Sequence, residues 1–590
     1  NTSPTSNPNP NPSPNPNPNP TSTQLMHRET GEPLDYCLSN GEAWPLGAEL
    51  VFPDGERRAV RFDPPRLLEL GVSPVFKRLL SGCEVFPSLK VTGATAELKY
   101  EWFLQSGTSP TDDWALAGAA PTFTPSENDV GAALWLRVTP LGTEGATPGR
   151  ALSHFFTRRI EAAPEPMLLV QRREWLAEPR PEGSFRVLSY NLLADAYTRQ
   201  ENIQKKLFPY AVRNECIDSS YRFNLALREI AEVGADLLCL QEVDASFYLR
   251  TLRPFAALHG LTGTFVGKAG GSSEGCAILA RDARFAFEDE YAYDVVHRRL
   301  FLGPDADPST LGLGAGESFP FPETRAQMQE LLGPLCALYP DLRVQLTEHL
   351  NSVTQLRVLR IRRDDAADTD SPLEFLIVAN NHLYYHPLAD HIRCIQMCAV
   401  LESLRELQAR IEAEHGGGRT AVMLIGDLNS CVRSPAYELL TAGLCRSGLD
   451  AIDRAVGADY ETPADHKAWE NLNKFFWGRQ KRKDAAAAAA NGGGAPPVPR
   501  GEYRPRLKNR LRGQLVDAYY DGDNEARPAT NFTPSFREVL DYVCVQAPEL
   551  EVLRTAEVPG ADLLEEYEAI PSPVCPSDHV SLLVDVRPRG

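Results

Sequence analysis

The feature that most constrains the fold is a series of short apolar runs, each the length of one buried strand, that alternate with helical patterns from residue 185 onward. The predicted strands are 185–190, 236–240, 375–379 and 421–425, with further strands near 540 and 580. Helices are predicted at 220–233, where apolar residues share one face before Gly234, and at 389–413. Strands that alternate with helices build layered sheets. We therefore expect an α/β domain over 185–588.

The preceding residues have a different composition. Residues 1–27 are rich in Asn and Pro, and such a segment is expected to be disordered because it cannot bury a core. Short β patterns and turn signals fill 28–165, including the Asp-Gly turn of a hairpin near residue 54. They predict a smaller β-rich, sandwich-like domain. We expect a linker at 166–184 and a disordered insertion at 481–499, where a run of alanines precedes glycine and proline.

Charge and cysteine content exclude several classes of protein. The net charge of −19 argues against a protein that coats nucleic acid through a global positive field, but not against an enzyme that acts on a polyanion. No apolar run approaches the roughly 18 residues of a membrane span, so we expect no transmembrane segment and no membrane partner. The twelve cysteines are scattered without a C-x-x-C pair, which favours a reducing compartment over a disulfide scaffold or a zinc ribbon.

Polar residues follow or flank six of the predicted strands, where ligands collect in open α/β sheets. One Asp in such a place is usually a helix cap or turn former, but six strand ends with Asn, Asp, Glu or His form a constellation. Carboxylate and amide oxygens suit Mg²⁺ or Mn²⁺, and two histidines beside several carboxylates suit transfer of a phosphoryl group to water. These residues are Asn191, Glu242, Asn380, His382, Asp427, Asn429, Asp541, Asp578 and His579.

The motifs around these residues resemble the exonuclease–endonuclease–phosphatase superfamily over about 185–588. In chain order they read Ser-Tyr-Asn-Leu-Leu-Ala at 189–194, Gln-Glu-Val-Asp at 241–244, Asn-Asn-His-Leu at 380–383, Gly-Asp-Leu-Asn-Ser at 426–430, Leu-Asp-Tyr at 540–542 and Ser-Asp-His at 577–579. Within it the chain is similar to the deadenylase branch and to its 2′-phosphodiesterase group. The resemblance implies a four-layered α/β sandwich with two facing sheets.

The resemblance also implies roles. Glu242 and Asp578, with Asp427 and Asn429, would hold the metal, Mg²⁺ or Mn²⁺. Asp427 would orient or deprotonate the attacking water, and His579, oriented by Asp541, would contact a phosphate oxygen. His382 is a further catalytic candidate. The implied substrate-binding residues are Asn191, Asn380, Asn429, Tyr384, Phe532 and Arg393, although Tyr384 and Phe532 equally fit core packing and Arg393 a solvated surface position.

The function expected from this resemblance is 3′-to-5′ hydrolysis of adenylate-rich RNA tails and of 2′,5′-linked oligoadenylates to AMP. We expect RNA or oligoadenylate as partner, a monomer, and a mitochondrial or otherwise cytoplasmic protein. Two alternatives remain. One is a phosphatase or phospholipase-like phosphodiesterase of the same superfamily that acts on inositol phosphate or lipid. The other is a non-catalytic adaptor.

Overall fold

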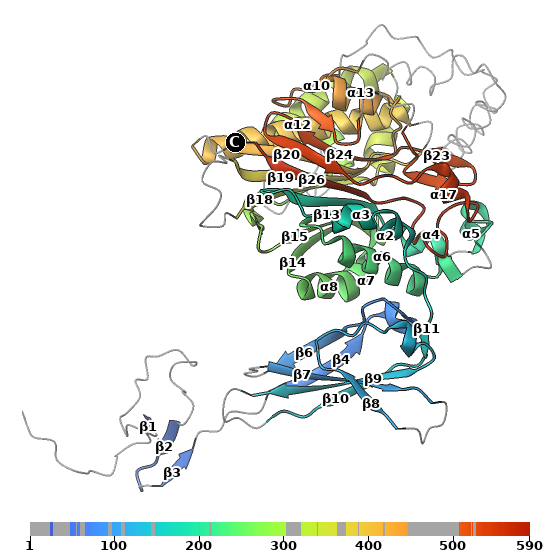
Figure 1. Cartoon of the computed structure of the whole chain (residues 1–590). Helices are drawn as coiled ribbons and strands as arrows, with labels where there is room; N and C mark the ends of the chain where they lie inside the picture. The colour runs from blue at the N-terminus through green and yellow to red at the C-terminus, as the bar shows by residue number, and fades with distance from the viewer. Residues whose placement is uncertain are drawn as a thin grey trace, which may run out of the picture. The chain divides into compact units, whose positions relative to one another are not determined.

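The structure is a computed structural model whose contacts divide the chain into two compact units (Figure 1). The small unit comprises 1–72, 87–121 and 133–156, and the large unit comprises 73–86, 122–132 and 157–590. Residues 1–23 of the predicted N-terminal disordered segment and the predicted insertion at 481–499 lie outside the described residues. The structure describes 24–27, 48–54, 56–59, 65–92, 97–107, 113–142, 148–199, 201–211, 215–302, 320–338, 340–362, 373–386, 389–416, 419–445, 507–520, 522 and 527–589.

Two mixed sheets form the centre of the large unit. The first has the order β14 (Leu261–Gly267), β15 (Glu274–Arg281), β13 (Leu237–Asp244), β12 (Phe185–Asn191), β26 (Leu582–Pro588) and β25 (Leu550–Thr555). The second has the order β16 (Phe285–Phe287), β18 (Val353–Ile361), β19 (Leu373–His382), β20 (Arg419–Asp427), β24 (Asp541–Gln546) and β21 (Leu515–Asp517), with β17 (Tyr293–Val296) paired to β18. The pairs β12–β13 and β19–β20 are parallel.

The two sheets pack face to face, and helices cover their outer faces (Figure 1). The facing strands are nearly continuous apolar runs because both of their faces are buried, and their side chains form one shared core. Outside the second sheet lie α12 (Asp390–Glu414), α10 (Pro322–Leu338) and α13 (Pro435–Ala442). The first sheet is covered by helices that include α6 (Ser219–Val233) and α8 (Arg253–Leu258). The predicted four-layered α/β sandwich is confirmed.

Local sequence explains where α6 begins and ends. The Asp218 side chain accepts a hydrogen bond from the backbone N–H of Ser220 and so caps the first turn. Gly234 follows the last turn in the left-handed conformation, with φ 55°, as a C-terminal glycine commonly does. Among the helices that the structure describes, none combines the length and the apolar character that a membrane crossing requires.

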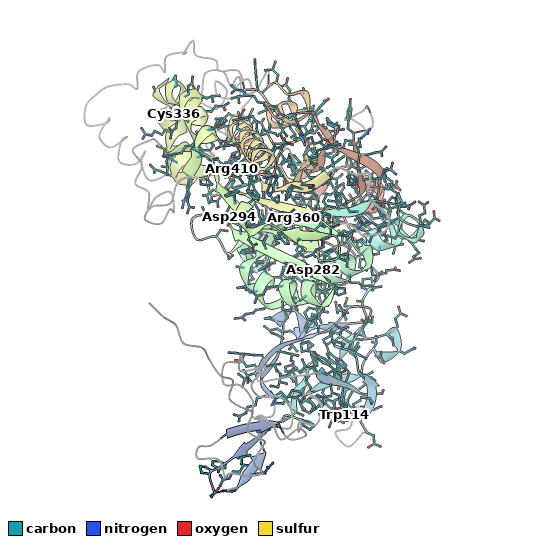
Figure 2. All side chains as sticks on the ribbon, turned by 90° about the vertical axis from the view of Figure 1, so that its left-hand side faces the viewer. Trp114, Asp282, Asp294, Cys336, Arg360 and Arg410 are labelled. Carbon is teal, nitrogen blue, oxygen red and sulfur yellow. The ribbon has the colours of Figure 1, made fainter. Side chains whose placement is uncertain are left out.

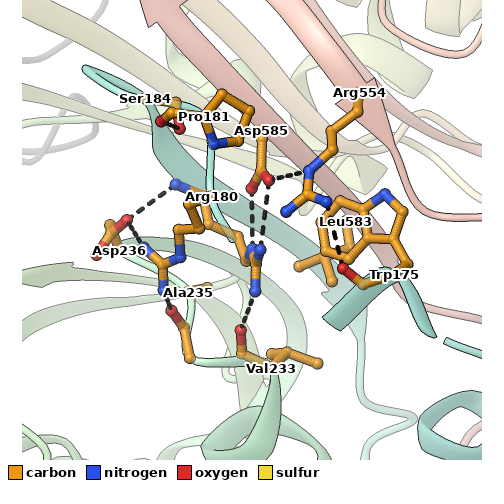
Figure 3. Close-up of polar contacts among 12 residues, drawn as sticks. Trp175, Arg180, Pro181, Ser184, Val233, Ala235, Asp236, Arg554, Leu583 and Asp585 are labelled. Carbon is orange, nitrogen blue, oxygen red and sulfur yellow. Dashed lines mark hydrogen bonds and ion pairs between the residues drawn. The ribbon is translucent and has the colours of Figure 1, made fainter. Parts of the chain in front are cut away.

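Buried ion pairs tie the first sheet together at the beginnings of β12 and β13 (Figure 3). The carboxylate of Asp585, fully buried in β26, accepts hydrogen bonds from Arg186 Nε at 2.9 Å and from Arg554 Nε at 2.7 Å. The carboxylate of Asp236 accepts hydrogen bonds from Arg281 Nε at 2.9 Å and from Arg180 Nη1 at 2.5 Å. Each buried carboxylate thus has two guanidinium partners, which is the condition under which burial of charge is tolerated.

The small unit is built from antiparallel strands. Its four-stranded sheet has the order β10 (Leu152–Phe155), β9 (Ala133–Leu141), β7 (Glu97–Gln105) and β8 (Ala115–Gly118). Two further pairings are β4 (Arg66–Val72) with β6 (Pro87–Thr92), and β1 (Gln24–His27) with β2 (Ala48–Val51) and β3 (Arg57–Ala59). The predicted hairpin is the β2–β3 pair. Side chains alternate along β9, and Leu134, Leu136 and Val138 face the core with Trp102.

Candidate active site

Ends of strands from both central sheets converge on one cluster of charged side chains. Asn191 ends β12, His382 ends β19 and Asp427 ends β20. Asp541 begins β24, which runs antiparallel to β20, and it lies directly opposite Asp427 in the register. Because parallel strands end at the same edge of a sheet, residues that are far apart in the sequence become neighbours.

Asp427 lies at the centre of this cluster. Asn191 Nδ2 donates to its Oδ2 at 3.0 Å, and the backbone N–H of Asn429 donates to its Oδ1 at 2.8 Å. The Nε2 atoms of His382 and His579 lie 3.6 and 3.8 Å from its Oδ2. Burial raises the pKa of Asp427 to about 6. The charge of His579 and the hydrogen bonds from Asn429 and Asn191 to Asp427 oppose that rise. A carboxylate with such a pKa can exchange protons near neutral pH.

Backbone geometry at the end of β20 admits only glycine before Asp427. Gly426 has φ 129°, and a Cβ atom on it would lie 2.1 Å from the carbonyl oxygen of Asn381 on the neighbouring strand β19. Asn429 follows two residues after Asp427 in the left-handed region, with φ 47°, where Asn is tolerated. The sharp turn brings the Asn429 N–H to Asp427, and Asn429 Nδ2 donates to Leu383 O at 3.1 Å.

Glu242 is placed by a bulge in β13. The register with β15 shifts between Leu240 and Val243, and Glu242 takes φ 52°, which a non-glycine residue seldom adopts. A bulge re-aims a side chain, and here Glu242 Oε2 accepts the backbone N–H of Ala194 at 3.0 Å. Its Oε1 lies 3.9 Å from His382 Nε2. Burial, with the charges of Glu274 and Asp578, raises the pKa of Glu242 to about 7.

His579 and Asp541 form a buried pair. His579 Nδ1 lies 2.8 Å from Asp541 Oδ2, which also accepts the Thr530 hydroxyl at 2.7 Å. Burial disfavours the imidazolium, but the charge of Asp541 and its hydrogen bond, helped by Asp427 and Asp578, raise the pKa of His579 well above its ordinary value. Burial, Lys268 and His579 lower the pKa of His382 well below its ordinary value. One histidine is therefore a cation at neutral pH and the other is neutral.

Lys268 and Glu274 join the cluster, although the sequence reasoning did not select them as site residues. Lys268 Nζ contacts Glu274 Oε1 at 2.7 Å, and both side chains are buried. Burial disfavours the ammonium, but the charges of Glu274 and Glu242 raise the pKa of Lys268. Lys268 directly follows β14, and Glu274 begins β15, the strand that pairs with β14, but neither strand was predicted from the sequence. Lys268 thus supplies a permanent positive charge beside Glu242.

Three of the predicted substrate-binding residues have protein partners in the structure. Asn380 is fully buried, and its amide Nδ2 donates to Leu240 O and Ala277 O, each at 3.0 Å, so it joins the two sheets. Asn191 Nδ2 donates to Asp427 and orients its carboxylate. Arg393 is buried and donates to the carbonyls of Tyr384 and His386.

The two aromatic residues that were predicted to bind substrate are enclosed in the structure. Tyr384 is 5% exposed and Phe532 is 1% exposed, and both belong to hydrophobic cores. Arg537 covers the Phe532 ring, with its guanidinium carbon 4.3 Å from the ring centroid. Tyr385, whose ring centroid lies 5.3 Å from that of Tyr384, is 54% exposed. In this loop, Tyr385 therefore offers an accessible aromatic surface that Tyr384 does not.

The donor set fits a hard divalent cation. Asp427, Asp541 and His579 offer ligand atoms that all lie within 4.8 Å of one another. Within that group His579 and Asp541 already bond each other, so the more available oxygens are those of Asp427 and Glu242. Burial raises the pKa of Asp578 and of Glu242, with smaller contributions from Asp541 and Glu274 respectively, so a bound cation would stabilise both carboxylates. Oxygen ligands in this arrangement suit Mg²⁺ or Mn²⁺.

Two facing sheets with a carboxylate and histidine cluster at one edge define a class of phosphoester hydrolases. A model of the Endonuclease/Exonuclease/phosphatase family matches residues 188–579, a stretch that holds every residue of the cluster, and the chain belongs to this family. It is 26% identical over 582 residues to 2′,5′-phosphodiesterase 12 of Homo sapiens, across 96% of this chain and 80% of that protein. The expected family and the expectation of an enzyme are confirmed.

Two further proteins match part of this chain. The chain is 22% identical over 433 residues to the CCR4-Not complex 3′-5′-exoribonuclease subunit Ccr4 of Saccharomyces cerevisiae, across 70% of this chain and 40% of that protein. Among solved structures, ANGEL2, a 2′,3′-cyclic phosphatase, in complex with adenosine-2′,3′-vanadate, matches with a TM-score of 0.44 at 20% identity, across 70% of this chain and 99% of that one.

Proposed function

We propose that this chain is a divalent-metal-dependent 3′-to-5′ exoribonuclease that releases AMP from adenylate-rich RNA tails and from 2′,5′-linked oligoadenylates. The observation that carries the proposal is the arrangement of Asp427 between Asn191, His382 and the His579–Asp541 pair. The similarity to the human 2′,5′-phosphodiesterase 12 along nearly the whole chain supports the substrate class.

In the proposed reaction, a water attacks the phosphorus of the terminal phosphodiester and the bond from phosphorus to the leaving ribose oxygen breaks. Asp427 accepts the proton of that water, a role that suits its pKa of about 6. The amide of Asn191 and the N–H of Asn429 hold both carboxylate oxygens of Asp427 in place. Such fixed geometry lowers the entropic cost of reaching the transition state.

The protonated His579 donates from Nε2 to a non-bridging phosphate oxygen, where negative charge builds up in the transition state. Asp541 accepts from Nδ1 and so keeps the imidazolium charged and correctly turned. Glu242, with Asp427 and Asp578, would hold Mg²⁺ or Mn²⁺, which when bound neutralises phosphate charge. The neutral His382, between Glu242 and Asp427, can donate or accept one hydrogen bond without adding charge.

The test is an assay of the purified full chain on 2′,5′- and 3′,5′-linked oligoadenylates, in Mg²⁺, in Mn²⁺ and in EDTA. We expect AMP as the product in either metal and none in EDTA. The Asp427→Asn variant serves as a control for contaminating nucleases. Release of inorganic phosphate alone, from these oligomers or from an inositol phosphate, would refute the proposal and show that the protein is a phosphatase. AMP release that persists in EDTA would refute the metal dependence.

A further inference from the structure

The small unit presents a row of apolar side chains across its four-stranded sheet. Phe155 of β10 lies opposite Trp135 of β9, Trp135 opposite Phe103 of β7, and Phe103 opposite Leu116 of β8. The core of the unit lies on the other face, where Leu134 and Leu136 are buried. The row therefore lies on the face that the core does not use, and an exposed apolar row of this kind often marks a binding surface.

Three rings of this row, Phe103, Trp135 and Phe155, form an aromatic column. The Phe103 and Trp135 centroids are 4.4 Å apart with 9° between the ring planes, and those of Trp135 and Phe155 are 5.1 Å apart with 14°. Trp114, labelled in Figure 2, meets Trp135 and Phe155 edge-on, with centroids 6.1 and 6.2 Å away. The inner rings are partly buried by one another, whereas Phe155, at the end of the column, is 60% exposed.

Charged residues border the column on the same face. Arg137, two residues after Trp135 in β9, places its guanidinium carbon 5.4 Å from the Phe103 centroid and 5.9 Å from that of Trp135. Arg137 and Lys99 share a single carboxylate, that of Glu101, at 2.8 and 3.0 Å. These three residues leave one excess positive charge beside the rings, in a chain whose net charge is −19.

We propose that this face binds single-stranded RNA, with a base stacked on the open side of Phe155 and a neighbouring phosphate on Arg137. A base has a flat face that continues a column of parallel rings, and stacking of this kind tolerates any sequence. The phosphate complements the excess cation at Arg137 and Lys99. The inference rests on the proposed function, because the small unit would bind the same RNA whose 3′ end the large unit would hydrolyse.

The test measures binding of a 20-nucleotide oligoadenylate to the full chain by fluorescence anisotropy, with Asp427→Asn in every protein to prevent cleavage. Phe155→Ala should weaken binding about tenfold, the scale of one lost base stack. Phe155→Tyr should restore it, because tyrosine keeps a ring of the same shape. Leu116→Ala is the matched control, since Leu116 is 61% exposed on the same face and has no ring, and we expect less than a twofold change.

A second variant tests the phosphate contact. Arg137→Gln should weaken binding and lower the slope of log affinity against log salt by about one, as expected for one lost phosphate contact. Photocrosslinking of an 8-azidoadenosine oligomer should label the peptides that carry Phe155 or Trp114. Phe155→Ala that binds like its parent while remaining folded by circular dichroism would overturn the proposal. So would a loss of self-association in Phe155→Ala with unchanged RNA binding, which would make the face a contact between copies.

Failure of this inference can be told apart from failure of the proposed function. The function is judged by AMP release from a trimer by the chain with Asp427 intact. The aromatic column is judged by the binding of the 20-nucleotide oligomer alone. A chain that cleaves the trimer but binds equally well with Phe155→Ala keeps the function and refutes the column. If the chain does not cleave the trimer but its binding of the 20-nucleotide oligomer is weakened by Phe155→Ala, the proposed function is refuted and the RNA-binding face is supported.

Discussion

His579 Nδ1 lies 2.8 Å from Asp541 Oδ2, and both side chains are buried at the edge where the two sheets meet. The carboxylate fixes the ring so that Nε2 is the nitrogen left for other partners, 3.8 Å from Asp427. A histidine bonded in this way keeps its proton at neutral pH, because the negative charge of Asp541 and its hydrogen bond raise the pKa of His579.

Asp541→Asn should therefore change the pH profile as well as the rate. We expect kcat to fall by about 10² to 10⁴, the range for a lost acid–base partner. The remaining activity should decline as the pH rises through the neutral range, because loss of the Asp541 charge and hydrogen bond lowers the pKa of His579. The native enzyme should show no such decline there. The measurement is kcat/KM from about pH 5.5 to 9.

Thr530→Val is the matched control for that variant. It removes the other hydrogen bond to Asp541 Oδ2, which spans 2.7 Å, but leaves the carboxylate charge in place. The rate should then drop far less, and the pH profile should keep its native shape. Parallel profiles for Asp541→Asn and the native enzyme would show that Asp541 does not sustain the charge on His579.

Glu242→Gln should stabilise the metal-free protein while it removes metal binding. Burial raises the pKa of Glu242 to about 7 in the folded protein, above its ordinary value of 4.5. A raised acid pKa means that stability falls as the pH rises from about 4.5 to 7 and stays low above it. The neutral amide avoids this cost, which is on the order of 3 kcal/mol for a shift of this size.

Thermal melts of both proteins check this prediction. In EDTA at pH 8, Tm should be several degrees higher for Glu242→Gln than for the native chain, and the difference should vanish near pH 4. Added Mg²⁺ or Mn²⁺ should raise Tm of the native chain and leave that of the variant unchanged. If the metal raised Tm equally in the two proteins, Glu242 would not be a metal ligand.

The strands were predictable from the sequence, but their polar ends were not. Apolar runs located the beginnings of β12, β13, β19 and β20, yet each strand continues beyond its run into residues such as Asn191, Glu242, His382 and Asp427. A polar residue ends an apolar pattern, so the pattern cannot show that the backbone continues as a strand. Asn191 and Asp427 are buried and hydrogen-bond each other across the two sheets, and such long-range pairing leaves no mark in local sequence.

The same limit applies to individual site residues. The motifs identified Asp427 and His579, which the structure brings to within 3.8 Å. They did not identify Lys268, because a single lysine outside the motifs looks like any solvated cation. They also suggested contacts with substrate for Phe532, whose burial depends on Arg537 and the core around it. Residue type therefore indicated the chemistry, whereas solvent access required the three-dimensional packing.

Asp427→Asn should abolish hydrolysis and preserve RNA binding. The amide keeps the shape of the carboxylate but cannot accept the proton of the attacking water, so we expect a loss of about 10² to 10⁴ in kcat. In the native enzyme, kcat/KM should fall below about pH 6, where Asp427 becomes protonated. That acid limb should be absent from the remaining activity of the variant. A variant within tenfold of the native rate would rule out Asp427 as the base.

Lys268→Met should destabilise the protein, and a second substitution should reverse the effect. Lys268 Nζ is 2.7 Å from Glu274 Oε1, with both side chains buried, and Glu242 adds to the negative charge around the ammonium. Removing the cation leaves buried carboxylates without a partner, which typically costs about 3 to 5 kcal/mol. Replacing Glu274 by Gln in the same protein removes one of those charges, so Lys268→Met/Glu274→Gln should recover most of the lost stability. Urea unfolding of the four proteins of this cycle gives the coupling energy, and additive effects would show that the two residues do not interact.

The Lys268→Met variant should also bind Mn²⁺ no more weakly than the native chain, because the loss of a neighbouring positive charge favours a metal at Glu242. A drop in Mn²⁺ affinity would contradict this account of Lys268.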